Sequence, residues 1–234
     1  MKKIEVCLSP ELINQYALKG KVVVVVDIFR ATSCIVTGFA NHVESFKAVQ
    51  EIEEAKALAK DGYLLAGERG GQKVQGFDLG NSPFEYQQDS MKGKKVAIST
   101  TNGTQAIVKS READEILIGA FLNLETVAEY LLQQEKDVII HCAGWKGSIN
   151  LEDSLFAGAL LDECAEEFTI EGDSSILVHQ FFVANHDNLL NVALKSSHAE
   201  RLRNFGIEKD QEFCLQESVF QVLPRVGKGF EIHC

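Results

Sequence analysis

The chain of 234 residues contains little proline and no long apolar run. Only three prolines are present, and no segment rich in Pro, Gly or Ser divides the chain into two parts. The longest glycine-free apolar run is Val22–Val26, which is far too short to span a bilayer. We therefore expect one domain over residues 1–234 and no membrane-spanning segment.

Positive charge is also scarce. Lys and Arg number 23 against 34 Asp and Glu, which gives a net charge of -11. Because such a chain repels nucleic-acid phosphates and anionic lipids, we expect neither as a partner. A small anionic ligand would need local positive charge or a metal. The N-terminal MKKIEVCLSPEL has no long apolar core after its lysines, so we expect no signal peptide and a cytoplasmic protein.

Several common functional motifs are missing. The six cysteines form no CxxC pair, which favours reduced structural thiols. The six histidines show no HxH, HxxxH or HExxH spacing, so a zinc site is not expected. Neither GxxxxGK[ST] nor GxGxxG occurs, and this argues against a P-loop and a dinucleotide-binding fingerprint.

Apolar runs alternate with amphipathic segments along most of the chain. This cadence is typical of an α/β fold with a mixed or mostly parallel sheet flanked by helices. From about Ser174 the pattern becomes mostly helical, and we interpret the terminal GKGFEIHC as an edge strand. The expected strands are 4–8, 22–26, 43–49, 63–66, 94–99, 114–120 and 136–143, and the expected helices are 31–40, 51–62, 102–113, 123–134, 151–168 and much of 178–206.

Polar residues gather directly after four of the expected strands. Ligands of open α/β sheets bind outside the carboxyl ends of strands, so these four junctions are the candidate site. They supply Asp27 and Arg30, then Glu68, Arg69, Asp78 and Asn81, then Thr100, Thr101, Asn102, Gly103 and Thr104, and finally Lys146, Glu152 and Asp153.

Asp27 follows five consecutive valines. An Asp at this position is commonly a helix cap worth about 1 kcal/mol, but it is also placed where a metal ligand or a base would stand. Arg30 could pair with Asp27. Arginine presents a planar fork suited to phosphate, sulfonate or carboxylate, and two of the chain's six arginines, Arg30 and Arg69, lie at these junctions.

The segment GERGGQKVQGFDLGNSP, residues 67–83, holds five glycines. It is either a solvated linker or a loop whose backbone approaches a small ligand closely. The TTNGT segment, residues 100–104, is either an anion cradle built from backbone N–H groups and hydroxyls or a helix cap with an Asn-Gly turn. Both alternatives remain open at this stage.

Oxygen donors dominate the four junctions. Glu152 and Asp153 precede a helix, where they complement its dipole or hold Mg²⁺, which prefers one or two carboxylates plus waters and substrate oxygens. Oxygen-only ligation favours Mg²⁺ or Mn²⁺ over zinc. Metal, arginine and backbone amides together suit phosphoryl transfer. The residues alone thus predict a metal-dependent site for a small phosphorylated or otherwise oxyanionic ligand.

Five segments of the chain form a recognisable series: VVVVVDIFRATSCIVTGFA, LLAGERGGQKVQGFDLGNSPFEY, ISTTNGTQAI, HCAGWKGSINLEDSLFAGALL and SSHAERLRNFGIEKDQEFCLQESVFQVLPRV. In this order they resemble the successive motifs of the 2-phosphosulfolactate phosphatases, the ComB family. The resemblance implies one ComB-like α/β domain over residues 1–234. It also implies a Mg²⁺-dependent acid phosphatase that converts 2-phosphosulfolactate to sulfolactate and phosphate, a step of coenzyme M biosynthesis.

On the matching positions, Asp27 is a metal ligand, a base or a nucleophile. A haloacid-dehalogenase-type phosphatase would need a second Asp two residues later, where this chain has Phe29, so we favour metal-activated water. Arg30 and Arg69 would bind the phosphate as catalytic residues. The metal candidates are Asp27, Glu68, Asp78, Glu152 and Asp153; the substrate-binding candidates are Thr100, Thr101, Asn102, Gly103, Thr104, Asn81 and Lys146.

Two other functions are compatible with the same residues. One is a Mg²⁺-dependent lyase or isomerase of a small carboxylate, and the other is a non-catalytic binder of anionic metabolites. The sequence leaves the physiological phosphoester and the oligomeric state, including a homo-oligomer, open.

Overall fold

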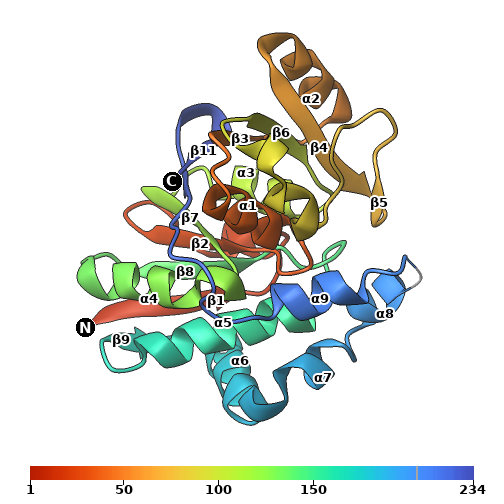
Figure 1. The fold of residues 1–234 in the computed structure, drawn as a ribbon. Coiled ribbons are helices and arrows are strands. Elements are labelled where there is room, and N and C mark those ends of the chain that lie inside the picture. The colour runs from red at the N-terminus through yellow and green to blue at the C-terminus, as the bar shows by residue number, and fades with distance from the viewer. Residues whose placement is uncertain (204) are drawn as a thin grey trace.

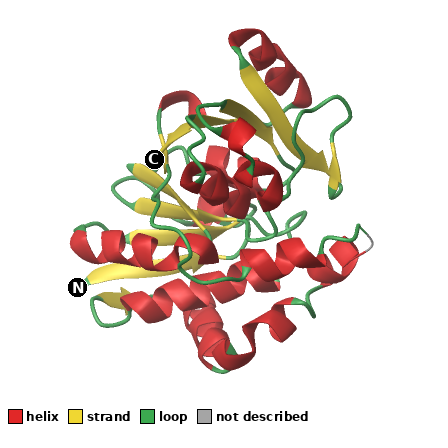
Figure 2. Cartoon of the chain, viewed as in Figure 1, coloured by secondary structure: helices red, strands yellow, loops and turns green. Residues whose placement is uncertain are grey.

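The computed structural model describes residues 1–203 and 205–234. In these ranges eleven strands form one mixed sheet in the order β5-β4-β6-β3-β11-β10-β7-β2-β8-β1-β9, with helices packed around it (Figures 1 and 2). The predicted α/β class is confirmed. The strands are β1 Lys2–Cys7, β2 Val22–Val26, β3 Ser45–Ala48, β4 Tyr63–Arg69, β5 Gln72–Lys73, β6 Lys95–Ser99, β7 Glu115–Gly119, β8 Val138–Cys142, β9 Phe168–Ile170, β10 Arg225–Val226 and β11 Glu231–His233.

Most helices follow a strand, as the alternation predicts. The predicted long helix from residue 151 ends earlier than expected, at Cys164, and Phe168–Ile170 instead pairs with β1 as the edge strand β9. None of the described helices is long and apolar enough to cross a membrane. The helices are α1 Ala31–Ala40, α2 Ile52–Leu58, α3 Gly103–Lys109, α4 Leu124–Gln133, α5 Leu151–Cys164, α6 Asp173–Val183, α7 Leu189–Ala193, α8 Ser197–Arg203 and α9 Glu208–Cys214.

The sheet consists of two parallel groups joined by an antiparallel hairpin. One group is β7-β2-β8-β1-β9 and the other is β3-β6-β4. The hairpin β10–β11 fills the seam, because β10 pairs with β7 and β11 pairs with β3. The prediction that GKGFEIHC forms an edge strand is therefore wrong. The sequence of a three-residue strand does not indicate which strands it pairs with. Here β11 covers the edge of β3 and β10 covers the edge of β7, and both edges would otherwise be unpaired.

Strand β2 lies deep in the larger group. All five of its valines are fully buried, as expected for a parallel strand with both faces covered. Helices α1 and α3 contact β7 and β2, while α4, α5 and α6 contact β7, β2, β8 and β1 (Figure 1). Asp27, at the carboxyl end of β2, faces a cavity that the segments after β4, β6 and β8 also line.

The C-terminal helices return to the carboxyl ends of the strands. The predicted helical C-terminal part is confirmed by α6, α7, α8 and α9. Helix α9 contacts the 3-10 turn Pro83–Gln87, which ends the glycine-rich segment, and α8 contacts α9. Residues more than 100 positions apart in the chain thus lie beside one another at this edge of the sheet (Figure 1).

Candidate active site

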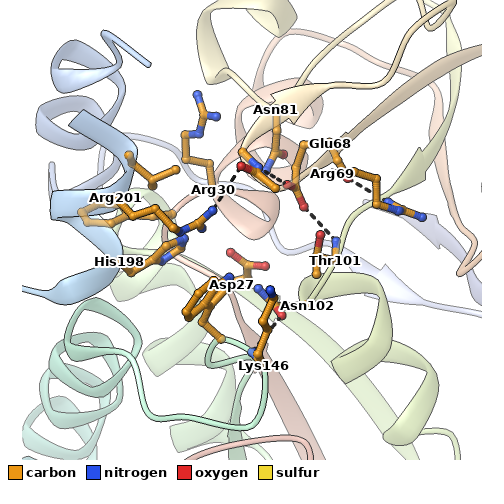
Figure 3. A pocket seen from close by; sticks show the side chains of 15 residues that line it. Asp27, Arg30, Glu68, Arg69, Asn81, Thr101, Asn102, Lys146, His198 and Arg201 are labelled. Atoms are coloured by element: carbon orange, nitrogen blue, oxygen red, sulfur yellow. Dashed lines mark hydrogen bonds between the residues drawn. The ribbon is translucent and has the colours of Figure 1, made fainter. Parts of the chain in front are cut away.

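One cavity of about 370 Å³ opens where the four polar junctions meet (Figure 3). A volume in this range is typical of small-molecule sites. The turn after β2, the end of β4, the loop after β6, the loop after β8 and helix α8 all contribute side chains to it. The lining residues are Asp27, Phe29, Arg30, Glu68, Arg69, Gly70, Gly71, Asn81, Thr101, Asn102, Trp145, Lys146, His198, Arg201 and Leu202.

Asp27 lies at the centre of this site. Its side chain is buried, and Oδ1 accepts a 3.3 Å hydrogen bond from the N–H of Ala31 in the first turn of α1. Burial raises the pKa of Asp27 to about 6; Glu68 and Glu152 add to the rise, whereas His198 and the Ala31 hydrogen bond oppose it. Helix α1 begins after Arg30, so Asp27 is not its N-cap residue; the carboxylate supports the first turn through this bond and also faces the cavity.

Gly103 explains how α3 comes so close to Asp27. A Cβ at this position would lie 2.7 Å from Asp27 Oδ2 and 2.6 Å from the Cβ of Ala31. Only glycine therefore lets the start of α3 pack against the turn after β2. Gly103 lies beside the site as predicted, and its contribution here is space for its neighbour.

Glu68 is the second carboxylate that faces the cavity. It is buried, and its Oε1 accepts the N–H of Thr101 at 2.8 Å while Oε2 accepts the N–H of Gly71 at 2.7 Å. These bonds tie the end of β4 to the loop after β6. The strand predicted to end at residue 66 runs on to Arg69 and turns back into β5, so Glu68 is held on regular structure.

The two predicted arginines have protein partners. Arg30 pairs with Asp210 of α9, whose other oxygen accepts the hydroxyl of Ser82 at 3.1 Å. The guanidinium of Arg69 donates to the carbonyl oxygens of Glu68, Ser99 and Gln50 at 2.8 to 3.0 Å. In Figure 3 it is turned away from Asp27. Both arginines line the cavity, and both also brace the loops around it.

Two of the predicted metal ligands, Asp78 and Asp153, do not line the cavity. Asp78 accepts the N–H of Leu65 at 2.8 Å and braces the glycine-rich segment. Asp153 accepts the N–H groups of Ile28 and Gly144 at 2.9 and 3.0 Å, and burial raises the pKa of its carboxyl well above the usual range. These two carboxylates hold the loops that carry the site.

Glu152 is fully buried in the layer below the cavity. Its Oε1 lies 2.6 Å from Nδ1 of His198, while Oε2 has no hydrogen-bond partner. Of the five predicted metal ligands, Asp27 and Glu68 are thus the two that face the cavity. Among the described residues, no group of three or more His, Cys, Asp or Glu side chains is arranged to hold a metal ion.

The TTNGT segment divides between the cavity and the helix. Thr100 Oγ1 accepts the N–H of Thr104 at 3.2 Å, and the hydroxyl of Thr104 donates to the carbonyl of Thr100. These two residues therefore form the cap of α3 that was one of the alternatives. Thr101 and Asn102 line the cavity, and Asn102 Oδ1 also accepts the N–H of Lys146 at 3.4 Å.

The lining residues that were not predicted from the sequence include Trp145, His198 and Arg201. The ring of His198 stacks on Trp145 with an interplanar angle of 15° and a centroid distance of 6.5 Å. The Arg201 guanidinium lies 4.6 Å from the centre of the Trp145 ring. His198 and Arg201 are three positions apart in an expected helix and so share a face, a signal that a search for metal-binding histidine spacing overlooks.

The cavity wall contains unpaired polar atoms. Seven buried side-chain N and O atoms of the described residues have no hydrogen-bond partner, and four of them belong to the lining residues Arg30, Asn81, Thr101 and Arg201. Because buried polar groups are normally paired, this concentration indicates a site built for a polar ligand.

Known proteins resemble this chain over most of its length. The sequence model of the family described as 2-phosphosulpholactate phosphatase matches residues 7–229. A probable 2-phosphosulfolactate phosphatase of Thermotoga petrophila is 42% identical over 206 residues, covering 88% of this chain and 89% of that protein. Proteins with the same name are 40% identical in Caldanaerobacter subterraneus (93% and 92% covered) and 33% identical in Clostridium beijerinckii (97% and 98% covered).

Proposed function

Because this chain belongs to the 2-phosphosulfolactate phosphatase family, we propose that it hydrolyses 2-phosphosulfolactate, or a closely related phosphorylated hydroxy acid, to sulfolactate and phosphate. The observation that carries the proposal is the meeting of two carboxylates, Asp27 and Glu68, with cationic side chains in one cavity. Cationic side chains neutralise the charge of a bound phosphoester. Carboxylates near the phosphorus atom contact the attacking water or a metal ion during hydrolysis.

The cavity is bordered by cationic side chains although the protein as a whole is acidic. The chain carries a net charge of -11, yet Arg30, Arg69, Lys146 and Arg201 all border this cavity. Local clusters of this kind set the potential inside a cleft, because the low-dielectric walls concentrate their field. Thr101 adds an unpaired hydroxyl that can donate to a substrate oxygen, whereas the unpaired amide oxygen of Asn81 accepts only from a water or a protonated phosphoryl oxygen.

The donor set fits Mg²⁺. Magnesium takes one or two protein carboxylates and completes its shell with waters and substrate oxygens, and Asp27 and Glu68 are the two carboxylates that face the cavity. These two residues would hold Mg²⁺, which would supply charge neutralisation at the phosphoryl group and a more acidic bound water. Both donors are carboxylate oxygens, the type of ligand that magnesium prefers.

We infer direct attack by water. The water oxygen bonds to phosphorus, the bond between phosphorus and the ester oxygen breaks, and the alcohol leaves with a proton. Asp27 Oδ2 is the atom available to contact the water or the metal, because Oδ1 accepts the Ala31 N–H. His198 is oriented by Glu152 through Nδ1, which leaves Nε2 to contact the substrate.

Phosphate release tests the proposal. We expect the purified protein to release inorganic phosphate from 2-phosphosulfolactate. Phosphate release should stop when EDTA is added and should resume with excess Mg²⁺. NMR of the organic product should show sulfolactate. The absence of phosphate release from both 2-phosphosulfolactate and 2-phospholactate would contradict a phosphatase.

The same experiment separates the other two functions. An unsaturated or rearranged organic product would identify a lyase or isomerase. Stabilisation of the protein by 2-phosphosulfolactate in a thermal shift assay, with no product at all, would identify a non-catalytic binder.

A further inference from the structure

The cations of the cavity fall into two classes. Arg30 is paired with Asp210, and Arg69 is occupied by three carbonyl groups and the Ser99 hydroxyl. No Asp or Glu of the described residues lies within ion-pair distance of Lys146 or Arg201. Arg69 also has no acidic partner, but protein oxygens take up its donors, whereas Arg201 donates to one carbonyl oxygen. Lys146 and Arg201 are therefore the cations of this cavity that are best placed to meet an anion from outside the protein.

Arg201 is held in place for such a contact. Its guanidinium lies against the Trp145 ring at 4.6 Å, and NH1 donates to the carbonyl oxygen of Gly70 at 3.2 Å. Its Nε is buried and has no partner. A stacked guanidinium is fixed in orientation while its edge keeps several donors free, which is the arrangement that binds an oxyanion.

Trp145 organises this part of the wall. Its ring packs against His198 and Arg201, and the Nζ of Lys146 lies 4.9 Å from its centre. The loop after β8 and the helix α8 therefore place two cations around one aromatic ring. In Figure 3 Arg201 lies on the opposite side of Asp27 from Glu68 and Thr101, while Lys146 lies beside Asn102.

We propose that Arg201, stacked on Trp145, together with Lys146 forms a second anion-binding site that selects phosphoesters bearing another strongly acidic group. This rests on the proposed function and deepens it. The phosphoryl group lies at Asp27, Glu68 and Thr101, and the second acid, a sulfonate or a carboxylate, contacts Arg201 and Lys146. Arg201 and Lys146 are then specificity-determining residues, and they contribute mainly to substrate binding.

Three phosphoesters test the selection. 2-Phosphosulfolactate bears a sulfonate and a carboxylate, 2-phospholactate bears only a carboxylate, and glycerol 2-phosphate bears neither. We expect Arg201→Gln to lower kcat/KM for the acid-bearing substrates about 10- to 100-fold relative to glycerol 2-phosphate, mainly through KM, as loss of a charged hydrogen bond predicts. A fall in the ratio of 2-phosphosulfolactate to 2-phospholactate assigns the sulfonate to Arg201, whereas an equal loss for both assigns the carboxylate.

Two further variants make the result decisive. Arg201→Lys retains the charge without the fork and should give an intermediate loss. Arg203→Gln is the matched control, because Arg203 lies in the same helix, does not line the cavity and donates to the Leu194 carbonyl. Ratios within twofold of the wild type in both Arg201 variants, with a native circular dichroism spectrum, would overturn the proposal.

Binding of the product separates this inference from the proposed function. Calorimetry with sulfolactate needs no turnover, and we expect its Kd to rise about tenfold or more in Arg201→Gln and to stay unchanged in Arg203→Gln. If the wild type binds sulfolactate through Arg201 but releases no phosphate, the phosphatase proposal fails and the anion site stands. If it hydrolyses 2-phosphosulfolactate with no effect of Arg201 on either measurement, the anion site fails alone.

Discussion

At the scale of single residues, Asp27 shows a conflict between stability and function. Its carboxyl is buried beside Glu68 and above Glu152, and its pKa is raised from 3.8 to about 6. The charged form is therefore destabilised in the folded protein relative to the unfolded chain. Natural active sites often retain such a loss of folding stability, because the buried charge is needed to bind the substrate or a metal.

Replacement of Asp27 by Asn should reveal this cost. A raised folded-state pKa means that the stability of the wild type falls as pH rises from about 4 through about 6. Asn does not ionise, so in EDTA we expect Asp27→Asn to have a higher Tm than the wild type at pH 8 and a nearly equal Tm at pH 4. Phosphate release should fall by about three orders of magnitude or more.

Differential scanning fluorimetry at the two pH values, with a phosphate assay, measures both effects. The exposed Asp61→Asn is the control and should change neither. A lower Tm of Asp27→Asn at pH 8 would instead assign the carboxylate mainly to supporting the first turn of α1.

At the scale of elements, hydrogen bonds from side chains to the backbone position the loops around the cavity. Asp153 joins the turn after β2 to the loop after β8, and Glu68 joins the end of β4 to the loop after β6. Arg69 adds bonds to Ser99, which ends β6, and to Gln50, which follows β3. Several of the charged residues that the sequence places at strand ends thus hold the site together from behind.

Arg69→Lys tests this bracing role. A single ammonium group cannot reach the carbonyl groups of residues 68, 99 and 50 as the guanidinium fork does, so we expect a loss of about 1–2 kcal/mol in the free energy of unfolding. Chemical denaturation measures it, and KM for 2-phosphosulfolactate should rise only modestly. An unchanged unfolding midpoint together with a large rise in KM would show that Arg69 binds the substrate directly.

At the scale of the whole molecule, the C-terminal hairpin joins the two parallel groups of strands. Ile232 of β11 is fully buried and pairs with Phe46 of β3, while Arg225 of β10 pairs with Leu117 of β7. Glu231 also accepts the hydroxyls of Ser45 and Tyr63 at 3.0 and 2.8 Å. The two halves that carry Asp27 and Glu68 are therefore connected through the last residues of the chain.

Truncating one side chain in this seam should affect both halves. We expect Ile232→Ala to lower the free energy of unfolding by about 2–5 kcal/mol, because it removes a fully buried side chain between two groups of strands. The neighbouring exposed His233→Ala is the matched control and should change stability by less than about 0.5 kcal/mol. A loss for Ile232→Ala no larger than that of the control, by urea denaturation, would mean that the hairpin is dispensable.

The sequence alone determined most of the longer strands and helices and the junctions at which the cavity lies. Five valines in a row predict a strand buried on both faces, and polar residues after four strands predict a site at their carboxyl ends, because strand and helix periods are local properties of the chain. The cavity lies at these four junctions. The motif resemblance likewise pointed to the family that the comparison of whole sequences then showed.

The tertiary structure decided which side chains face the cavity. Asp78 and Asp153 follow strands as Asp27 does, but they point at backbone N–H groups, a choice made by loop geometry. Arg201 reaches the cavity because α8 packs near strand ends that lie more than 100 residues earlier in the chain. Strand β11 likewise enters the interior of the sheet by pairing with a strand that is distant in the sequence. Contacts between such distant segments depend on how the elements pack, and no local period in the sequence records them.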